Sequence, residues 1–297
     1  MNLVAPLRVT FIVLAFLIGI GLAAASVLGV WDLFELSMRA ATQTDEATVV
    51  TGQIDGPPPL SFSSYGYLPG IAAIVLLGGL AALKRRWEAL ALTCWFLLGG
   101  VVLEVLLSIW SLWGEGLVSG FMRTAISTAW VFFPILGLLL AVAASARGEV
   151  RADAPSPISN RDKMRLRNTL VGLAVIGYVW RVATLVLSPG ATSALAYLRG
   201  TTDAYLVLGS IVGMGTAILL LVGIVLSRKE NDRFMNAALA FSAGFAFEGF
   251  LDAIDLMSGA GARLEVAYAL QDGVAFAASC AALALSERAG WRASRVT

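Results

Sequence analysis

Eight long apolar stretches divide this chain of 297 residues and constrain its fold more than any other feature. An α-helix needs about 20 predominantly apolar residues to cross the roughly 30 Å hydrocarbon core of a bilayer. The strands of a membrane barrel would instead alternate in polarity over about 10 residues, which these stretches do not do. The sequence therefore predicts an all-α, polytopic integral membrane protein with transmembrane helices at about 9–30, 68–83, 89–113, 122–146, 168–188, 204–227, 234–257 and 265–286.

The composition agrees with a chain that lies mostly inside a bilayer. Hydrophobic residues make up 58% of it and charged residues 14%, whereas soluble domains have about 45–50% and about 25%. The sequence contains no histidine, which removes the commonest metal ligand and the base of Ser-His and Cys-His pairs. A net charge of +1 gives no electrostatic attraction to nucleic acid. We therefore predict no enzymatic activity, no cofactor, no metal ion and no nucleic-acid partner.

Basic residues near the ends of the apolar stretches predict the orientation in the membrane. With the N-terminus inside, most of them fall on the cytoplasmic side, as the positive-inside rule requires. The outer side has Arg39, Arg123, Arg199 and Arg263. The inner side has Arg8, Lys84, Arg85, Arg86, Arg147, Arg151, Arg161, Lys163, Arg165, Arg167, Arg228, Lys229, Arg233, Arg288, Arg292 and Arg295. We expect both termini to be cytoplasmic, in a cell membrane of the bacterial inner-membrane type.

A polar segment at 147–167 divides the chain almost in half. Its stretch Asp153-Ala154-Pro155-Ser156-Pro157 has the composition of a linker. We predict a first four-helix membrane unit at 1–146, which includes an outer loop at about 31–67. The linker at 147–167 is then cytoplasmic, and a second four-helix unit with a short cytoplasmic tail follows at 168–297.

The two halves also resemble each other weakly, which indicates an internal duplication. At an offset of 144 residues Gly100 falls on Gly244 and Glu104 on Glu248. Helices rich in Ala, Leu and Gly match easily by chance, but carboxylates inside a membrane are rare. Because each unit would have an even number of helices, the sequence predicts a pseudo-two-fold axis along the membrane normal.

Six ionisable residues fall within the predicted spans: Glu104, Arg181, Glu248, Asp252, Asp255 and Asp272. Each costs about 2.5–3.5 kcal/mol at the centre of a bilayer, so such residues usually have partners or line water. The spacing i, i+4, i+7 places Glu248, Asp252 and Asp255 on one helix face. We expect this face to line a cavity or to contact other helices.

Three interpretations of these residues remain open. In the first, they are architectural, and Arg181 forms an ion pair with Asp272 or Asp252. In the second, they form a water-accessible acidic vestibule that binds cations or relays protons, with Glu104 and Glu248 at its floor. In the third, they form a polar docking face for a partner subunit or for lipid headgroups.

These interpretations lead to two classes of function. The first is an integral membrane transporter or channel for protons or small cations, which would use the carboxylate cluster in the outer half of the bilayer. The alternative is a non-enzymatic subunit of a larger complex that docks partner helices or binds lipid or quinone. The expected partners are the lipid bilayer and either other membrane subunits or further copies of the chain.

Overall fold

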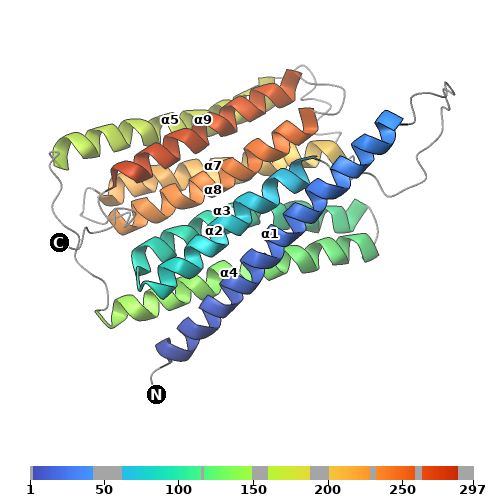
Figure 1. The fold of residues 1–297 in the computed structure, drawn as a ribbon. Helices are drawn as coiled ribbons and strands as arrows, with labels where there is room; N and C mark the ends of the chain where they lie inside the picture. The colour runs from blue at the N-terminus through green and yellow to red at the C-terminus, as the bar shows by residue number, and fades with distance from the viewer. Residues whose placement is uncertain are drawn as a thin grey trace.

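The computed structural model describes residues 3–42, 62–114, 117–148, 160–187, 201–227, 232–257 and 263–286. Within these ranges the side chains of 29–42, 62–68, 106–131, 160, 201–206, 255–257 and 263–265 are not described. All regular secondary structure in the described residues is helical (Figure 1). The helices are α1 (Val4–Thr42), α2 (Phe62–Leu83), α3 (Trp87–Gly114), α4 (Leu117–Ala146), α5 (Asn160–Leu187), α7 (Thr201–Ser227), α8 (Asp232–Met257) and α9 (Arg263–Leu285).

Each predicted span falls on one of these helices, which confirms an all-helical fold. Six of them contain a described stretch long and apolar enough to cross a membrane: Val4–Leu28, Trp87–Val105, Arg161–Leu187, Val207–Ser227, Asp232–Ile254 and Val266–Leu285. The described apolar parts of α2 and α4 are shorter, at Pro69–Leu83 and Phe132–Ala146. The structure therefore supports a helical membrane protein, and the crossing of the bilayer by α2 and α4 stays a prediction.

Several helices extend beyond the predicted apolar spans. α1 continues to Thr42, so the predicted outer loop at about 31–67 is helical in its first part. α2 and α5 begin earlier than the apolar pattern predicts. α2 begins at Phe62 and continues through Pro69, because membrane helices tolerate the single backbone hydrogen bond that a proline removes. α5 begins at Asn160, inside the predicted linker, and its first turns contain Arg161, Lys163 and Arg165. Hydropathy detects only the part of a helix that is apolar, so a charged extension beyond the bilayer is invisible to it.

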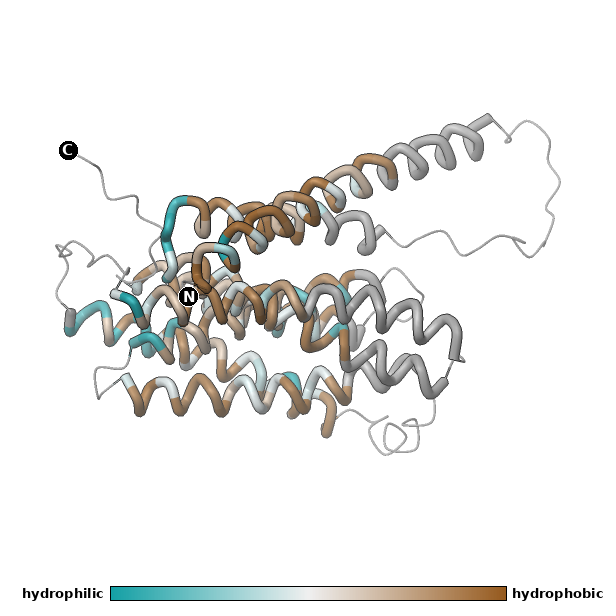
Figure 2. The backbone as a smooth tube through the Cα atoms, turned by 90° about the horizontal axis from the view of Figure 1, so that it is seen from below, coloured by the Kyte–Doolittle hydropathy of each residue, from teal (hydrophilic) through white to brown (hydrophobic). Residues whose placement is uncertain are grey.

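The helices pack into one bundle in which α3 and α8 are central. α3 contacts α2, α4, α7 and α8, and α8 contacts α2, α3, α7 and α9. α1 crosses the bundle obliquely and contacts α2 and α4 (Figure 1). Apolar residues predominate along the helices, and polar residues gather toward the end of the bundle near the N-terminus (Figure 2).

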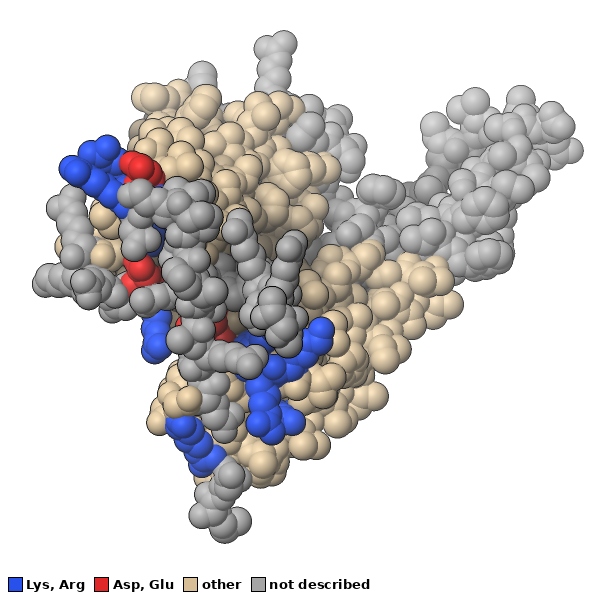
Figure 3. Space-filling model, turned by 60° about the vertical axis from the view of Figure 1, so that its left-hand side comes forward, with Lys and Arg blue, Asp and Glu red and all other residues tan. Residues whose placement is uncertain are grey.

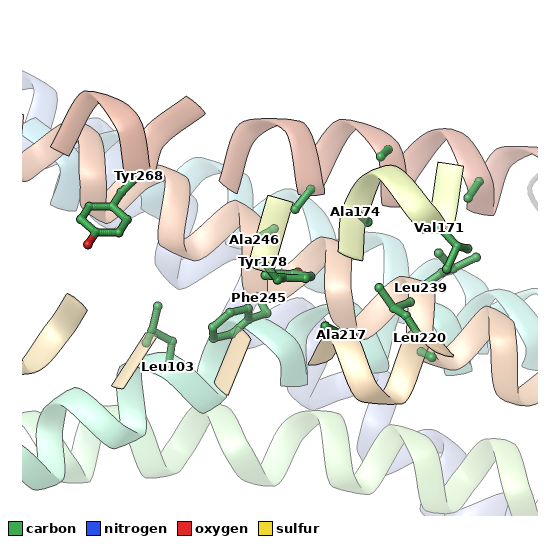
Figure 4. Packing of buried hydrophobic residues seen from close by; sticks show 14 of the residues in the cluster. Leu103, Val171, Ala174, Tyr178, Ala217, Leu220, Leu239, Phe245, Ala246 and Tyr268 are labelled. Carbon is green, nitrogen blue, oxygen red and sulfur yellow. The ribbon is translucent and has the colours of Figure 1, made fainter. Parts of the chain in front are cut away.

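The buried apolar side chains form two large clusters. The first joins α1, α2, α3 and α4 through residues such as Phe11, Val75, Leu90 and Leu140. The second joins α5, α7, α8 and α9, and Leu103 of α3 also belongs to it (Figure 4). A small third cluster, Leu92 with Ala240, lies between α3 and α8. The interface between α3 and α8 therefore lies between the two main cores.

At this interface two glycines bring the helix backbones together. A Cβ atom on Gly99 would overlap the backbone of Phe241, and one on Gly244 would overlap the backbone of Phe96. Small residues at such a crossing let membrane helices approach closely and gain van der Waals contact. Any larger side chain at Gly99 or Gly244 would force α3 and α8 apart.

Basic residues gather at one end of the bundle, as the sequence predicts (Figure 3). They come from the start of α1, the α2–α3 turn, the end of α4 and the starts of α5 and α8: Arg8, Lys84, Arg85, Arg86, Arg147, Arg161, Lys163, Arg165, Arg167 and Arg233. The guanidinium of Arg167 donates to the carboxylate of Asp232 at 3.1 Å and joins α5 to α8 there. We refer to this region as the basic end.

Candidate functional site

A buried ion pair joins α5 to α9. Arg181 Nη1 donates to Asp272 Oδ2 at 2.5 Å, and both side chains are almost completely excluded from solvent, at 0% and 1% exposed. Counted from Arg167, Arg181 lies about 21 Å along α5 at 1.5 Å per residue. The pair is therefore deep inside the bundle, and it confirms one of the two pairings that the sequence left open for Arg181.

The neighbouring helices are shaped around this pair. A Cβ atom on Gly209 of α7 would overlap the Arg181 guanidinium, and one on Gly249 of α8 would overlap the Asp272 carboxylate. The ring of Tyr268 lies one turn before Asp272, with its centroid 5.3 Å from Arg181 Cζ, within the range of a cation–π interaction. Glycines on two helices and an aromatic ring thus enclose the pair.

Enclosure of this kind indicates an architectural role for Arg181 and Asp272. The two charges compensate each other where water is excluded, and breaking a buried pair leaves an uncompensated charge that is strongly destabilising. An aspartate held by an arginine at hydrogen-bonding distance is already satisfied by a cation. We therefore separate these two residues from the carboxylates that remain candidates for function.

Glu248 of α8 lies on a different face of that helix and points toward α3. Its side chain is 5% exposed, and its Oε2 atom lies 3.6 Å from the position that a Cβ on Gly100 would occupy. Gly249, the next residue, faces Arg181 and Asp272 instead, because successive residues of a helix are rotated by about 100°. Adjacent residues of α8 therefore face the ion pair and α3.

Glu248 also lines a small pocket between α2, α3 and α8. The pocket has a volume of about 20 Å³, which is enough for one water molecule. Apart from Glu248, its walls are mostly apolar and include Ile71, Ile74, Phe96, Val101 and Phe247. Residues from both halves of the chain therefore form this pocket.

Two further carboxylates lie along the same interface. Glu104 is one turn beyond Gly100 on α3, and Asp252 is one turn beyond Glu248 on α8, so each continues its helix face. Both side chains are half-buried. We call this region, defined by Gly100, Glu104, Glu248 and Asp252, the α3–α8 seam. The side chain of the sixth predicted residue, Asp255, lies outside the described residues.

A second set of buried polar contacts is not predicted by the sequence. Tyr178 of α5 donates its hydroxyl to the carbonyl oxygen of Ser242 at 3.0 Å and lies 2.9 Å from Ser242 Oγ. Ser242 of α8 in turn lies 2.8 Å from Ser279 Oγ of α9. These bonds connect three helices of the second half. Isolated serines and tyrosines in apolar helices carry no periodic signal, so only their placement reveals the network.

Another contact next to the ion pair was also missed. Gln271 Nε2 donates to Thr184 Oγ1 at 2.8 Å and joins α9 to α5. The spacing of polar residues in α5 and α9 could have indicated the surroundings of the ion pair. Arg181 and Thr184 are spaced i, i+3, and Tyr268 and Asp272 are spaced i, i+4, so each pair presents polar groups on one helix face.

Comparison with protein families, with curated proteins and with solved structures found no match to this chain. Its class is therefore defined by its own geometry. The molecule is a bundle of long apolar helices. Charged groups are buried deep inside it, and basic residues gather at one end. These properties define a helical membrane protein.

Proposed function

We propose that this protein transports protons or small cations across the membrane and that the α3–α8 seam holds the transport site. The observation that carries the proposal is the Glu248 carboxylate, which is buried in a pocket that both halves of the chain line. Ionisable groups are expensive at such depth and mark ion pathways when they do not serve packing. Arg181 and Asp272 serve packing, and the proposal assigns transport to Glu248, with Glu104 and Asp252 beside it on the seam.

The helix contacts support the two four-helix units and the pseudo-two-fold axis that belong to this proposal. If α1, α2, α3 and α4 correspond to α5, α7, α8 and α9, each pair of helices that packs through its described residues within one unit has a counterpart in the other. The contacts between the units also correspond: α3 contacts α7, and its counterpart α8 contacts α2. The axis would then pass between α3 and α8.

The glycine contacts at the α3–α8 crossing also correspond between the two units, and they suggest the residue offset that relates α3 to α8. Gly99 meets Phe241, and Gly244 meets Phe96, so the two contacts are equivalent at an offset of 145 residues. That offset also matches Phe96-Leu97-Leu98-Gly99 with Phe241-Ser242-Ala243-Gly244. It differs by one residue from the offset of 144 that pairs Glu104 with Glu248. In this register Glu248 corresponds to Leu103, so the two units differ in chemistry although their backbones correspond.

A site at the interface of two repeats suits transport for a mechanical reason. Small movements of one unit against the other open such an interface first to one side of the membrane and then to the other. Counted from Asp232, Glu248 lies about 24 Å along α8 from the basic end. The basic end is the cytoplasmic side in this proposal, in keeping with the positive-inside rule, and the membrane is the cell membrane.

The test is ion flux into sealed vesicles that contain the purified protein. We expect the wild type to dissipate an imposed proton or cation gradient and the Glu248→Gln variant to lose this flux, because the amide keeps the shape but holds no charge. Glu88→Gln, at the basic end of α3, is the matched control and should retain wild-type flux. Absence of flux in the wild type, or unchanged flux in Glu248→Gln, would refute the proposal.

A further inference from the structure

The lining of the Glu248 pocket also bears on which ion the seam carries. The Glu248 carboxylate is the charged group of this lining, and side chains such as Ile71, Ile74 and Phe247 are hydrocarbon. The nearby carbonyl oxygen of Gly244 belongs to the α8 helix, where such oxygens accept backbone hydrogen bonds. Among the described residues that line this pocket, the ionisable side chain is therefore this one carboxylate.

One carboxylate is a poor site for a metal cation stripped of water. Calcium takes 6–8 oxygen ligands, and magnesium takes six in near-octahedral geometry. Within the part of the chain that the structure describes, no three His, Cys, Asp or Glu side chains converge to hold a metal ion. A hydrated cation would bring its own oxygens, but the pocket has room for about one water molecule.

A proton has no such requirement. It binds covalently to one carboxylate oxygen, and the resulting carboxyl group is neutral, which suits an apolar pocket. One water molecule is sufficient to deliver it. Hydronium transfers its proton to a Glu248 carboxylate oxygen and leaves as water, and the reverse transfer to a second water returns the carboxylate. Charge and atoms balance in both directions without another reactant.

We propose that the seam is selective for protons and that Glu248 is the group that takes up and releases each proton. This inference rests on the proposed transport function and assigns its substrate. Glu104 and Asp252, one turn further along the seam, then lie on the path by which a proton reaches or leaves Glu248.

Flux measurements with separated ions test the substrate. Vesicles containing the wild type are given either a pH gradient, followed by an internal pH-sensitive dye, or a gradient of radioactive sodium at constant pH. We expect proton flux that is unchanged when choline replaces sodium, and no sodium uptake above that of protein-free vesicles. Sodium uptake that Glu248→Gln abolishes would overturn the proton assignment while leaving the transport proposal intact. Absence of any flux would overturn both.

Chemical labelling tests the residue independently of transport. Dicyclohexylcarbodiimide is an apolar reagent that reacts with protonated carboxyl groups, and mass spectrometry locates the modified residue. We expect modification of Glu248 that increases as the pH is lowered and that added sodium does not reduce. Asp272 is the internal control and should stay unmodified, because its carboxylate is 1% exposed and is enclosed by Arg181, Gly249 and Tyr268, which leaves no room for the reagent. Protection of Glu248 by sodium, or no modification of Glu248 at any pH, would contradict the assignment.

Discussion

Replacing Arg181 by methionine isolates the role of the buried ion pair. Methionine retains much of the length of the side chain but leaves the Asp272 carboxylate, 1% exposed, without its partner. Two unit charges 4 Å apart attract by about 4 kcal/mol at an effective dielectric constant of 20, and breaking a buried pair costs about 3–5 kcal/mol in measured cases. We expect Arg181→Met to lower the free energy of unfolding by a similar amount.

A double-mutant cycle distinguishes the pair from a simple loss of packing. In Arg181→Met combined with Asp272→Leu, no charge remains, and apolar replacements of a buried pair are often neutral or stabilising. We expect the double variant to recover most of the loss. Unfolding in mixed micelles of a mild detergent and dodecyl sulfate, followed by tryptophan fluorescence, measures all four proteins under one condition. Losses that add within about 0.5 kcal/mol would show that the residues do not interact and would refute this assignment.

Two further substitutions test the packing. Gly244→Leu should lower the unfolding free energy by about 3 kcal/mol or more, because its side chain overlaps the Phe96 backbone. Gly215→Leu, where a Cβ meets nothing within 4 Å, is the control, and equal losses would contradict a close α3–α8 crossing. Arg85 has a φ of 55° in the α2–α3 turn, so Arg85→Gly should raise the unfolding free energy by about 0.5–1 kcal/mol. Thermal unfolding of Arg85→Gly, with Lys84→Gly as the control, measures this gain in stability. A lower midpoint for Arg85→Gly than for the wild type would contradict the prediction.

The positions of the helices follow from the sequence because apolar run length is a local property. A long apolar stretch satisfies its backbone hydrogen bonds internally as a helix whatever surrounds it. The starts of α2 and α5 did not follow, since both helices begin in residues outside the apolar pattern, with Ser63 and Ser64 in α2 and the charged turn at Arg161 in α5. Helix ends depend on what lies beyond the apolar region, which hydropathy does not describe.

The candidate site was only partly predictable. The rarity of charge in apolar helices identified Arg181, Glu248 and Asp272, and the cost of leaving Arg181 alone made an ion pair one of three open interpretations. The contact between Arg181 and Asp272 depends on how α5 and α9 are rotated about their axes. The rotation of α8 turns Glu248 toward α3, away from the pair that Gly249 faces.

The sequence by itself determined that this chain is helical and apolar enough for a membrane, that its basic residues gather at one end, and that a few charges lie deep inside. These properties depend on residue type and on spacing along one helix. Only the tertiary structure decided which charges neutralise each other and which carboxylate lines a pocket, because those outcomes depend on contacts between helices far apart in the chain. Gly99 and Gly244 illustrate the difference: they are ordinary small residues in the sequence, and the packing of α3 against α8 places each of them against the backbone of the other helix.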